Sequence, residues 1–216
     1  YSKSCGGRRD DLLRCFPAEV QVQVFEYRVT SPPQICQIVV DLGKHAYKDG
    51  CFYFVLLGDD VVIRTPKEDI LPLLRDSFRR IARRLSAPFG FGCVAFHDET
   101  SLGFPTFPVV TKLHFDIFDQ FWCPKDFINQ DADPYLYELY RRYEASHFCS
   151  QLILRDEIGG ADSITPPTRY KKHHVDWKSE LLTKGARQID HYFTQQKWSV
   201  LPQCLRMDII VPSYRI

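Results

Sequence analysis

Residues 52–63, FYFVLLGDDVVI, constrain the fold of this chain more than any other segment. An apolar run is followed by Gly58 and then by two adjacent aspartates, Asp59 and Asp60. A continuous apolar run of this length is typical of a sheet strand that is covered on both faces. Because an unpaired carboxylate is costly to bury, the two aspartates predict that this interior strand ends at a cleft. In open α/β sheets, ligands bind at such carboxyl ends of strands.

The segment before this strand predicts a strand–helix–strand unit. Residues 19–27 alternate valine with polar residues, which is the two-residue period of a strand. Residues 34–48 carry apolar residues at helical spacing and are followed by an Asp-Gly pair, a typical helix end. We therefore expect strands 19–27 and 52–57 to be parallel neighbours joined by this helix.

The rest of the chain predicts further helices and strands around the same sheet. Amphipathic spacing indicates helices, and short apolar runs bounded by Gly and Pro indicate strands. The helices are expected from about Asp69 to 87, within 128–143 and over most of 169–193. The strands are expected over 89–98, at the start of 109–124 and over 206–216. These elements predict an α/β fold, and the Gly- and Pro-rich segment 158–168 predicts a loop.

The composition of the chain limits the kinds of molecule that its surface would attract. The chain has 216 residues, 44% of them hydrophobic, and a formal net charge of +1. This balance gives no field that would attract nucleic acid, and no apolar run reaches the length of about 20 residues that a membrane span needs. The eight cysteines form no CxxC pair and no zinc-like cluster, so the compartment stays open between the cytoplasm and the Golgi lumen.

Two carboxylates at the end of a strand predict a site for a hard divalent cation such as Mn²⁺ or Mg²⁺. Asp59 and Asp60 are the candidates, and an ordinary turn that uses aspartate for local hydrogen bonds is the alternative. His173 and His174 are candidates to complete a metal site, with a simple surface location as the alternative.

A carboxylate base is a second candidate feature. The segment DAD, residues 131–133, supplies Asp131 and Asp133, and either could take a proton from a hydroxyl group. Asp133 is also explained as the N-cap of the following helix, with Pro134 at its first position. The weaker candidates are His97 with Asp98 and His114 with Asp116, and for a histidine among apolar neighbours a packing role is the simpler interpretation.

Two groups of side chains have both a structural and a functional interpretation. Four arginines lie largely off the apolar stripe of the helix after Asp69: Arg79, Arg80, Arg83 and Arg84. They form either a solvated basic face or a patch that binds phosphate or a partner. Phe121, Trp122 and Tyr135 either pack in the core, which we favour, or form an apolar platform for a sugar ring.

Three segments in chain order carry a resemblance to a known family. They are DGCFYFVLLGDDVVI (49–63), FGCVAFHDE (91–99) and FPTFPVVTKLHFDIFDQFWCPKDFINQDADPYLYELYRR (104–142). Together they resemble a divergent GT-A glycosyltransferase of the family-2-like kind, over about residues 18–193. The resemblance implies a GT-A-like mixed sheet flanked by helices, a nucleotide-diphospho-sugar donor, a divalent metal and an acceptor hydroxyl on a carbohydrate or glycoconjugate.

The resemblance also implies roles for particular residues. Asp60 matches the metal-binding last residue of the DXD motif and Asp59 its middle residue, while Gly58 departs from the aspartate expected at its first position. Asp133, or otherwise Asp131, matches the catalytic base of an inverting enzyme. His174 or His173 matches the C-terminal contact to the metal or the diphosphate, and the choice between them stays open.

The two ends of the chain depart from the pattern of this family. The first strand of a GT-A fold is expected before residue 1, whereas MDIIVPSYRI (207–216) resembles the opening strand of a family-2 glycosyltransferase. We therefore expect a glycosyltransferase domain at 1–204 that lacks its first strand, and at 205–216 the start of a second such domain in the same protein. A circular permutation, in which the terminal strand fills the vacant place, is the alternative.

Two other functions stay open at this point. One is a catalytically inactive GT-A-like module that binds or scaffolds within a larger multidomain protein. The other is a metal-dependent phosphohydrolase that uses the same aspartates and histidines, although the lack of a second clear carboxylate cluster disfavours a two-metal site.

Overall fold

A computed structural model describes residues 35–58, 61–156 and 172–196. The chain divides into two compact units, Tyr1–Thr30 and Ser31–Ile216, and all the described residues belong to the second. The strands expected at 19–27 and 206–216 lie outside the described residues, as does the loop at 158–168. The division of the chain at residue 204 therefore stays a prediction.

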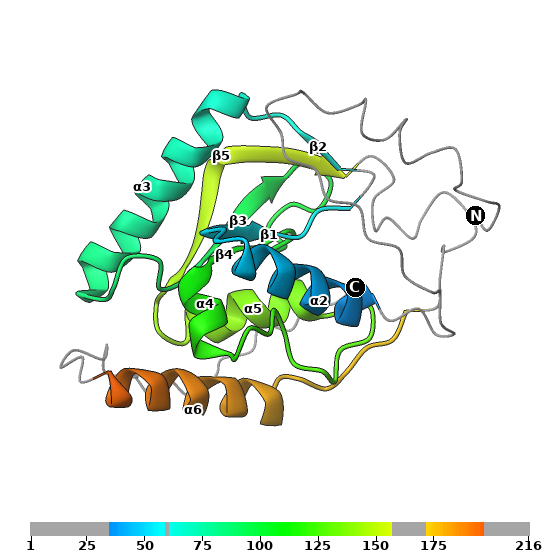
Figure 1. Ribbon diagram of the computed structural model, residues 1–216. Helices are drawn as coiled ribbons and strands as arrows, with labels where there is room; N and C mark the ends of the chain where they lie inside the picture. The colour runs from blue at the N-terminus through cyan, green and yellow to red at the C-terminus, as the bar shows by residue number, and fades with distance from the viewer. Residues whose placement is uncertain (1–34, 59–60, 157–171, 197–216) are drawn as a thin grey trace. The chain divides into compact units, whose positions relative to one another are not determined.

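Five strands form one mixed sheet in the order β1–β4–β3–β5–β2 (Figure 1). β3 and β5 run parallel, and every other neighbouring pair is antiparallel. The strands are β1 (Tyr53–Val55), β2 (Val61–Ile63), β3 (Cys93–Asp98), β4 (Val109–Thr111) and β5 (Ser146–Asp156). The prediction of an α/β fold with a mixed sheet flanked by helices is confirmed at this level.

The helices cover this sheet because each has one apolar stripe to bury. α3 packs against β3 and β5 through Leu74, Phe78 and Ile81, while α5 packs against the same two strands and carries α6 on its other side. Figure 1 shows α3 well apart from α5 and α6. The helices are α2 (Ile35–Lys48), α3 (Lys67–Leu85), α4 (Lys112–Ile117), α5 (Ala132–Arg141) and α6 (Glu180–Gln195).

The apolar run at 52–57 does not form the buried central strand that its composition predicted. Only Tyr53–Val55 form a strand, and β1 lies at one end of the described sheet, antiparallel to β4. Within β1, Phe54 is buried against the Phe115 ring, whereas Val55, which points to the opposite face, is 42% exposed. The run thus has one buried face, and its apolar composition was misleading.

The longest strand, β5, was not predicted from the sequence. Its pairing with β3 is interrupted, because Phe96 lies opposite Cys149 whereas the next residue, His97, lies opposite Ile153. The Thr65 hydroxyl holds this bulge: it accepts a hydrogen bond from the Ile153 amide at 2.7 Å and donates to the Gln151 carbonyl at 3.0 Å. A bulge of this kind breaks the alternation of side chains that identifies a strand in a sequence.

Two other boundaries differ from the prediction. α3 begins at Lys67, two residues before the expected start, with Pro66 as its N-cap, so Pro72 lies inside the helix. The Pro72 ring leaves this helical position without a backbone N–H donor. The segment after β4, expected to be irregular, begins with α4, whose N-cap Thr111 accepts a hydrogen bond from the Leu113 amide at 3.2 Å.

A glycine sets the start of β3. Gly92 has φ +131°, and a Cβ atom there would meet the Ala145 carbonyl oxygen, which accepts a hydrogen bond from the Cys93 amide at 2.9 Å. No other residue type combines this backbone conformation with so close an approach of two chains. The parallel pairing of β3 with β5 therefore begins at a position that only glycine fits.

We predict that Gly92→Ala lowers the free energy of unfolding by about 2–4 kcal/mol, because the added methyl group combines strain at positive φ with a clash against backbone. The measurement is chemical denaturation of the purified variant. Gly103→Ala is the matched control: Gly103 also has positive φ (+76°), but nothing lies within 4 Å of its Cβ position. A loss of stability no larger than in this control would contradict the close approach.

Candidate active site

Two of the sequence candidates meet just before the start of α5. Asp131 is the residue before the helix, in the left-handed conformation at φ 72°, which aspartate tolerates better than most residues. Its carboxylate does not cap the helix. It accepts a hydrogen bond from the Val175 amide at 2.9 Å and contacts the His174 Nδ1 atom at 3.0 Å. Asp131 and His174, predicted separately as site residues, are therefore direct neighbours.

The segment that carries His174 is fixed by a second contact. The side-chain oxygen of Asn129, which is buried, accepts a hydrogen bond from the His173 amide at 2.9 Å. His173 thus contributes its backbone to this contact, while the His174 side chain is 64% exposed beside an Asp131 side chain that is 14% exposed. Of the two histidines that the sequence left open, His174 is the one whose imidazole contacts a candidate carboxylate.

Asp133 lies in the first turn of α5 and is not its N-cap, so the capping prediction was wrong. One carboxylate oxygen accepts a hydrogen bond from the Phe107 amide at 3.3 Å. Burial disfavours its charged form and raises the pKa of Asp133 to about 6, although the Phe107 amide opposes this shift. A carboxylate with a pKa so close to neutrality is suited to accept a proton under physiological conditions.

Asp98 connects this site to the sheet. It is the last residue of β3, is 2% exposed, and accepts hydrogen bonds from the Thr100 amide at 2.8 Å and the Thr106 hydroxyl at 3.1 Å. The next residue after Thr106 is Phe107, whose amide binds Asp133. The carboxyl end of β3 thereby determines the position of the loop that contacts the candidate base.

The predicted site for a divalent cation includes residues inside and outside the described ranges. Asp59 and Asp60, which the sequence made the principal ligands, lie outside the described residues. Within the described ranges, no group of three or more His, Cys, Asp and Glu side chains could hold a metal ion. Asp131 and His174 supply two potential ligands, fewer than a divalent cation requires, so the described residues alone do not fit a metal site.

His114 has the packing role that its apolar neighbours predicted. It is 2% exposed, its Nδ1 atom lies 2.9 Å from the Tyr140 hydroxyl, and its Nε2 atom lies 3.0 Å from the Trp122 carbonyl. The carbonyl can only accept, so Nε2 carries the proton and Nδ1 accepts from Tyr140. Burial lowers the pKa of His114 to about 4. Its companion candidate, Asp116, accepts a hydrogen bond from the Tyr47 hydroxyl.

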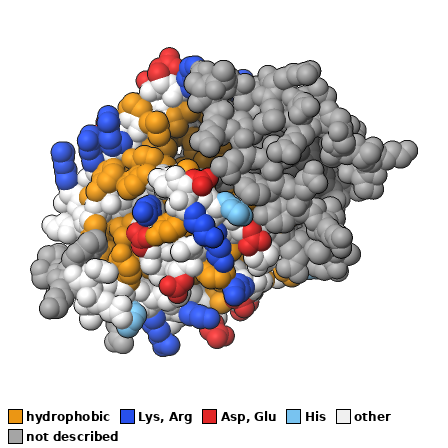
Figure 2. Space-filling model, in the orientation of Figure 1, with side chains coloured by type: hydrophobic (Ala, Val, Ile, Leu, Met, Phe, Trp, Pro, Cys, Tyr) orange, Lys and Arg blue, Asp and Glu red, His pale blue; other side chains and the backbone are white. Residues whose placement is uncertain are grey.

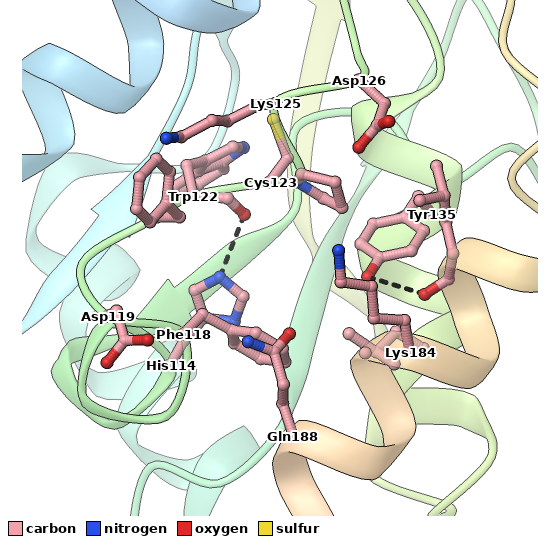
Figure 3. Close-up of a pocket in the computed structure, with 15 residues that line it drawn as sticks. His114, Phe118, Asp119, Trp122, Cys123, Lys125, Asp126, Tyr135, Lys184 and Gln188 are labelled. Carbon is pink, nitrogen blue, oxygen red and sulfur yellow. Dashed lines mark hydrogen bonds between the residues drawn. The ribbon is translucent and has the colours of Figure 1, made fainter.

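A pocket of about 330 Å³ lies between the α4–α5 connection, α5 and α6 (Figure 3). Figure 3 shows Lys184 and Gln188 on α6 opposite Trp122, Cys123 and Lys125. Its fifteen lining residues include all three aromatic side chains that were considered as a sugar platform. Two of them, Trp122 and Tyr135, are each only 2% exposed and belong to the core, so core packing is the correct interpretation for them.

Sequence reasoning did not identify this pocket, because its polar residues are spread over two distant segments. Lys125 and Asp126 come from the connection before α5, and Lys184 and Gln188 come from α6. The spacing of Lys184 and Gln188, one helical turn apart, is the single signal in the sequence. α6 approaches α5 closely because Gly185 has no side chain: a Cβ atom there would lie 2.5 Å from the Tyr135 hydroxyl oxygen.

The arginines of α3 form an exposed basic face, seen as a row of blue side chains at the left edge of Figure 2. Arg79 pairs with Asp76 at 3.3 Å, and the Arg84 guanidinium donates to the Glu144 carbonyl. Exposed pairs of this kind contribute little to stability. Arg79, Arg80 and Arg83 line a shallow hollow with Asp76, and a solvated face accounts for it.

No helix in the described part of the chain combines the length and the apolar character needed to cross a membrane. Comparisons of the chain with protein-family models, with curated proteins and with solved structures found no match.

We predict that Asp131→Gly frees the 173–175 segment from the start of α5. Glycine accepts the left-handed conformation without strain, so the variant removes the two side-chain contacts and little else. Because a lost hydrogen bond to a charged group costs about 1.5–3 kcal/mol, hydrogen exchange at the Val175 amide should accelerate roughly 10- to 150-fold. Asp131→Asn is the control, since its amide oxygen can still accept from Val175. Equal exchange in the two variants would contradict the contact.

We predict that the fold loses stability on acidification through His114. Its pKa in the folded protein, about 4, lies below the ordinary 6.5, so the unfolded chain binds the additional proton between these values. Keeping His114 neutral in the folded state contributes on the order of 3 kcal/mol to the free energy of unfolding. This contribution is fully present above about pH 6.5 and is lost as the pH falls toward 4. Long-range ¹H–¹⁵N spectra of the imidazole should show His114 neutral at pH 5. A titration midpoint near 6.5 would contradict the burial.

Proposed function

We propose that this chain is part of a glycosyltransferase that moves a sugar from a nucleotide-diphospho-sugar donor to an acceptor hydroxyl. Three observations support the proposal: the ordered resemblance of the sequence to GT-A enzymes, the mixed α/β sheet, and the contact between Asp131 and His174 just before α5, two residues before Asp133 in the sequence. The feature that carries most weight is the Asp133 carboxylate in the first turn of α5, which binds the Phe107 amide and whose pKa is raised to about 6 by burial.

In this proposal Asp133 is the general base. As the acceptor hydroxyl attacks the anomeric carbon, its proton passes to the Asp133 carboxylate, and the sugar configuration is inverted in one displacement. A base with a pKa near the working pH is effective because it is ionised before the step and basic enough to take the proton. The Phe107 amide binds one carboxylate oxygen and orients the group, and in the proposal the other oxygen would take the proton.

Asp131 and His174 have a supporting role in the proposal. Their contact joins the 173–175 segment to the start of α5, and in the proposal the exposed imidazole would meet an anionic group of the donor. The divalent cation, Mn²⁺ or Mg²⁺, would require ligands beyond this pair, and Asp59 and Asp60 are the residues proposed to supply them. Because those two residues lie outside the described ranges, no step is assigned to the cation.

An inactive GT-A-like module of a larger multidomain protein is the second candidate. One observation favours it: the Asp131 carboxylate is already engaged by Val175 and His174, so the described residues offer no open set of metal ligands. The two candidates differ in whether any donor is turned over, and an assay of donors separates them.

The first experiment is a panel of nucleotide sugars incubated with the full-length protein and Mn²⁺, with release of the nucleoside diphosphate as the readout. We expect turnover of at least one donor, and we expect chelation of the cation to stop it. Donor binding by calorimetry without turnover on any sugar would support the inactive module instead.

We predict that Asp133→Asn leaves donor binding intact and lowers the rate of transfer by about 10²- to 10⁴-fold, the usual contribution of a general base. In the wild-type enzyme the rate should rise as the pH increases through about 6 and then level off, because Asp133 must be ionised to accept the proton. Asp176→Asn, at an exposed carboxylate two residues after His174, is the control and should transfer at the wild-type rate. Retained transfer in Asp133→Asn would place the base elsewhere.

A further inference from the structure

Two neighbouring residues near the end of the β3–β4 loop bind two different carboxylates. The Thr106 hydroxyl donates a hydrogen bond to Asp98 at 3.1 Å, and the Phe107 amide donates one to Asp133 at 3.3 Å. Asp98 ends β3 and is 2% exposed, and its second oxygen accepts from the Thr100 amide at 2.8 Å. The end of the loop is therefore attached to the sheet on one side and to the candidate base on the other.

The backbone between these two contacts is strained. Phe107 has φ 49°, in the left-handed region, where a bulky residue is uncommon. Such a conformation persists only where the surrounding structure fixes it, and strained residues of this kind occur preferentially at functional sites. The Thr106 hydroxyl on Asp98 and the Phe107 amide on Asp133 are the contacts that hold Phe107 from its two sides.

Hydrogen bonds at its base, rather than packing of its tip, hold the β3–β4 loop. Leu102 and Phe104 at the tip are 74% and 47% exposed, so they contribute little apolar burial. At the start of the loop, the Thr100 hydroxyl donates to the Asp156 carbonyl of β5 at 3.1 Å. At its end, the corresponding side-chain contact with the sheet is that of Thr106 with Asp98.

We propose that Thr106 is a positioning residue for the candidate base: its hydroxyl, bound to Asp98, fixes the backbone of Phe107 so that the Phe107 amide stays hydrogen-bonded to the Asp133 carboxylate. The inference rests on the proposed function, because it requires Asp133 to be the general base. It adds a role for a side chain that itself contacts neither Asp133 nor the reacting groups.

The contact with the Phe107 amide has two consequences for Asp133. It orients the carboxylate, and a general base must lie within hydrogen-bond reach of the hydroxyl whose proton it takes. It also lowers the pKa of Asp133, in opposition to the larger effect of burial, and so favours the ionised form that can accept a proton. Loss of the Thr106 hydroxyl should weaken both effects together.

The first measurement is hydrogen exchange at the Phe107 amide of the full-length protein, which needs no substrate. Thr106→Val replaces the hydroxyl by a methyl group, and we expect exchange to accelerate about tenfold or more, because a hydrogen bond to a charged group is lost. Thr106→Ser keeps a hydroxyl and should exchange as the wild type does. Unchanged exchange in Thr106→Val would overturn the proposal.

Thr100→Val is the matched control for this measurement. It removes a hydroxyl from the same loop and its contact with the Asp156 carbonyl, but it keeps the amide that Asp98 binds. Exchange at Phe107 should therefore stay close to that of the wild type. Equal acceleration in Thr100→Val and Thr106→Val would show a general loosening of the loop and would also overturn the proposal.

The second measurement is transfer by the full-length protein with a nucleotide sugar that the wild type turns over. We expect kcat of Thr106→Val to fall about 10- to 100-fold, with KM for the donor changed less than about twofold, and to recover in Thr106→Ser. The rise of the rate with pH should also move to higher pH in Thr106→Val, because the Phe107 amide no longer lowers the pKa of Asp133. A variant that is merely less folded would lose rate equally at every pH, and that result would contradict positioning.

The two measurements separate failure of this inference from failure of the proposed function. If the wild type turns over no donor although exchange at Phe107 responds to Thr106→Val, the proposed function is wrong and the contact stands. If the wild type is active and Thr106→Val transfers at the same rate, the positioning role is wrong and the proposed function stands.

Discussion

The parallel pairing of β3 with β5 is the constraint on which the rest of the described structure depends. Parallel neighbours cannot be joined by a tight turn, and a connection with its own secondary structure is required. Here that connection contains β4, α4 and α5, so the start of α5 is brought back over the sheet. The pairing begins at Gly92, where the Ala145 carbonyl approaches too closely for a side chain, and ends at Asp98, which organises the loop before Asp133. A series of contacts thus connects the start of this pairing to the candidate base.

Sequence patterns predicted the helices well and the strands poorly. α2, α3, α5 and α6 each have an apolar stripe at helical spacing, and each was expected within a few residues of its observed position, apart from the late start of α6 at Glu180. β5 was not predicted because the bulge held by Thr65 shifts its pairing in mid-strand. β1 was misjudged because composition alone does not reveal whether other elements cover both faces of a strand. Such information lies in contacts between distant segments, which a local pattern cannot contain.

The same holds for the candidate site: residue types could be selected from the sequence, whereas contacts between distant segments could not. Asp131, Asp133, His173 and His174 were selected individually by residue type. The contact between Asp131 and His174 was not predicted, because it depends on Asn129 binding the His173 amide across a long separation in the chain. The capping role assigned to Asp133 was wrong because the helix begins one residue earlier than Asp133, at Ala132. Asp59 and Asp60 remain candidates from the sequence alone.

Two aspartates separated by a single residue have different surroundings, and the proposed roles of the two residues follow from this difference. The Asp131 carboxylate is engaged by the Val175 amide and by His174, contacts that satisfy a negative charge and occupy its oxygens. Asp133 has one hydrogen bond of 3.3 Å and a desolvated environment, so its ionised form is destabilised and its pKa rises to about 6. The raised pKa means that the folded state is favoured while Asp133 is protonated, below about pH 4, and that this contribution is lost as the pH rises through 6. Environments that separate two neighbouring carboxylates in this way support the proposal that Asp133 is the base and that Asp131 holds the 173–175 segment in place.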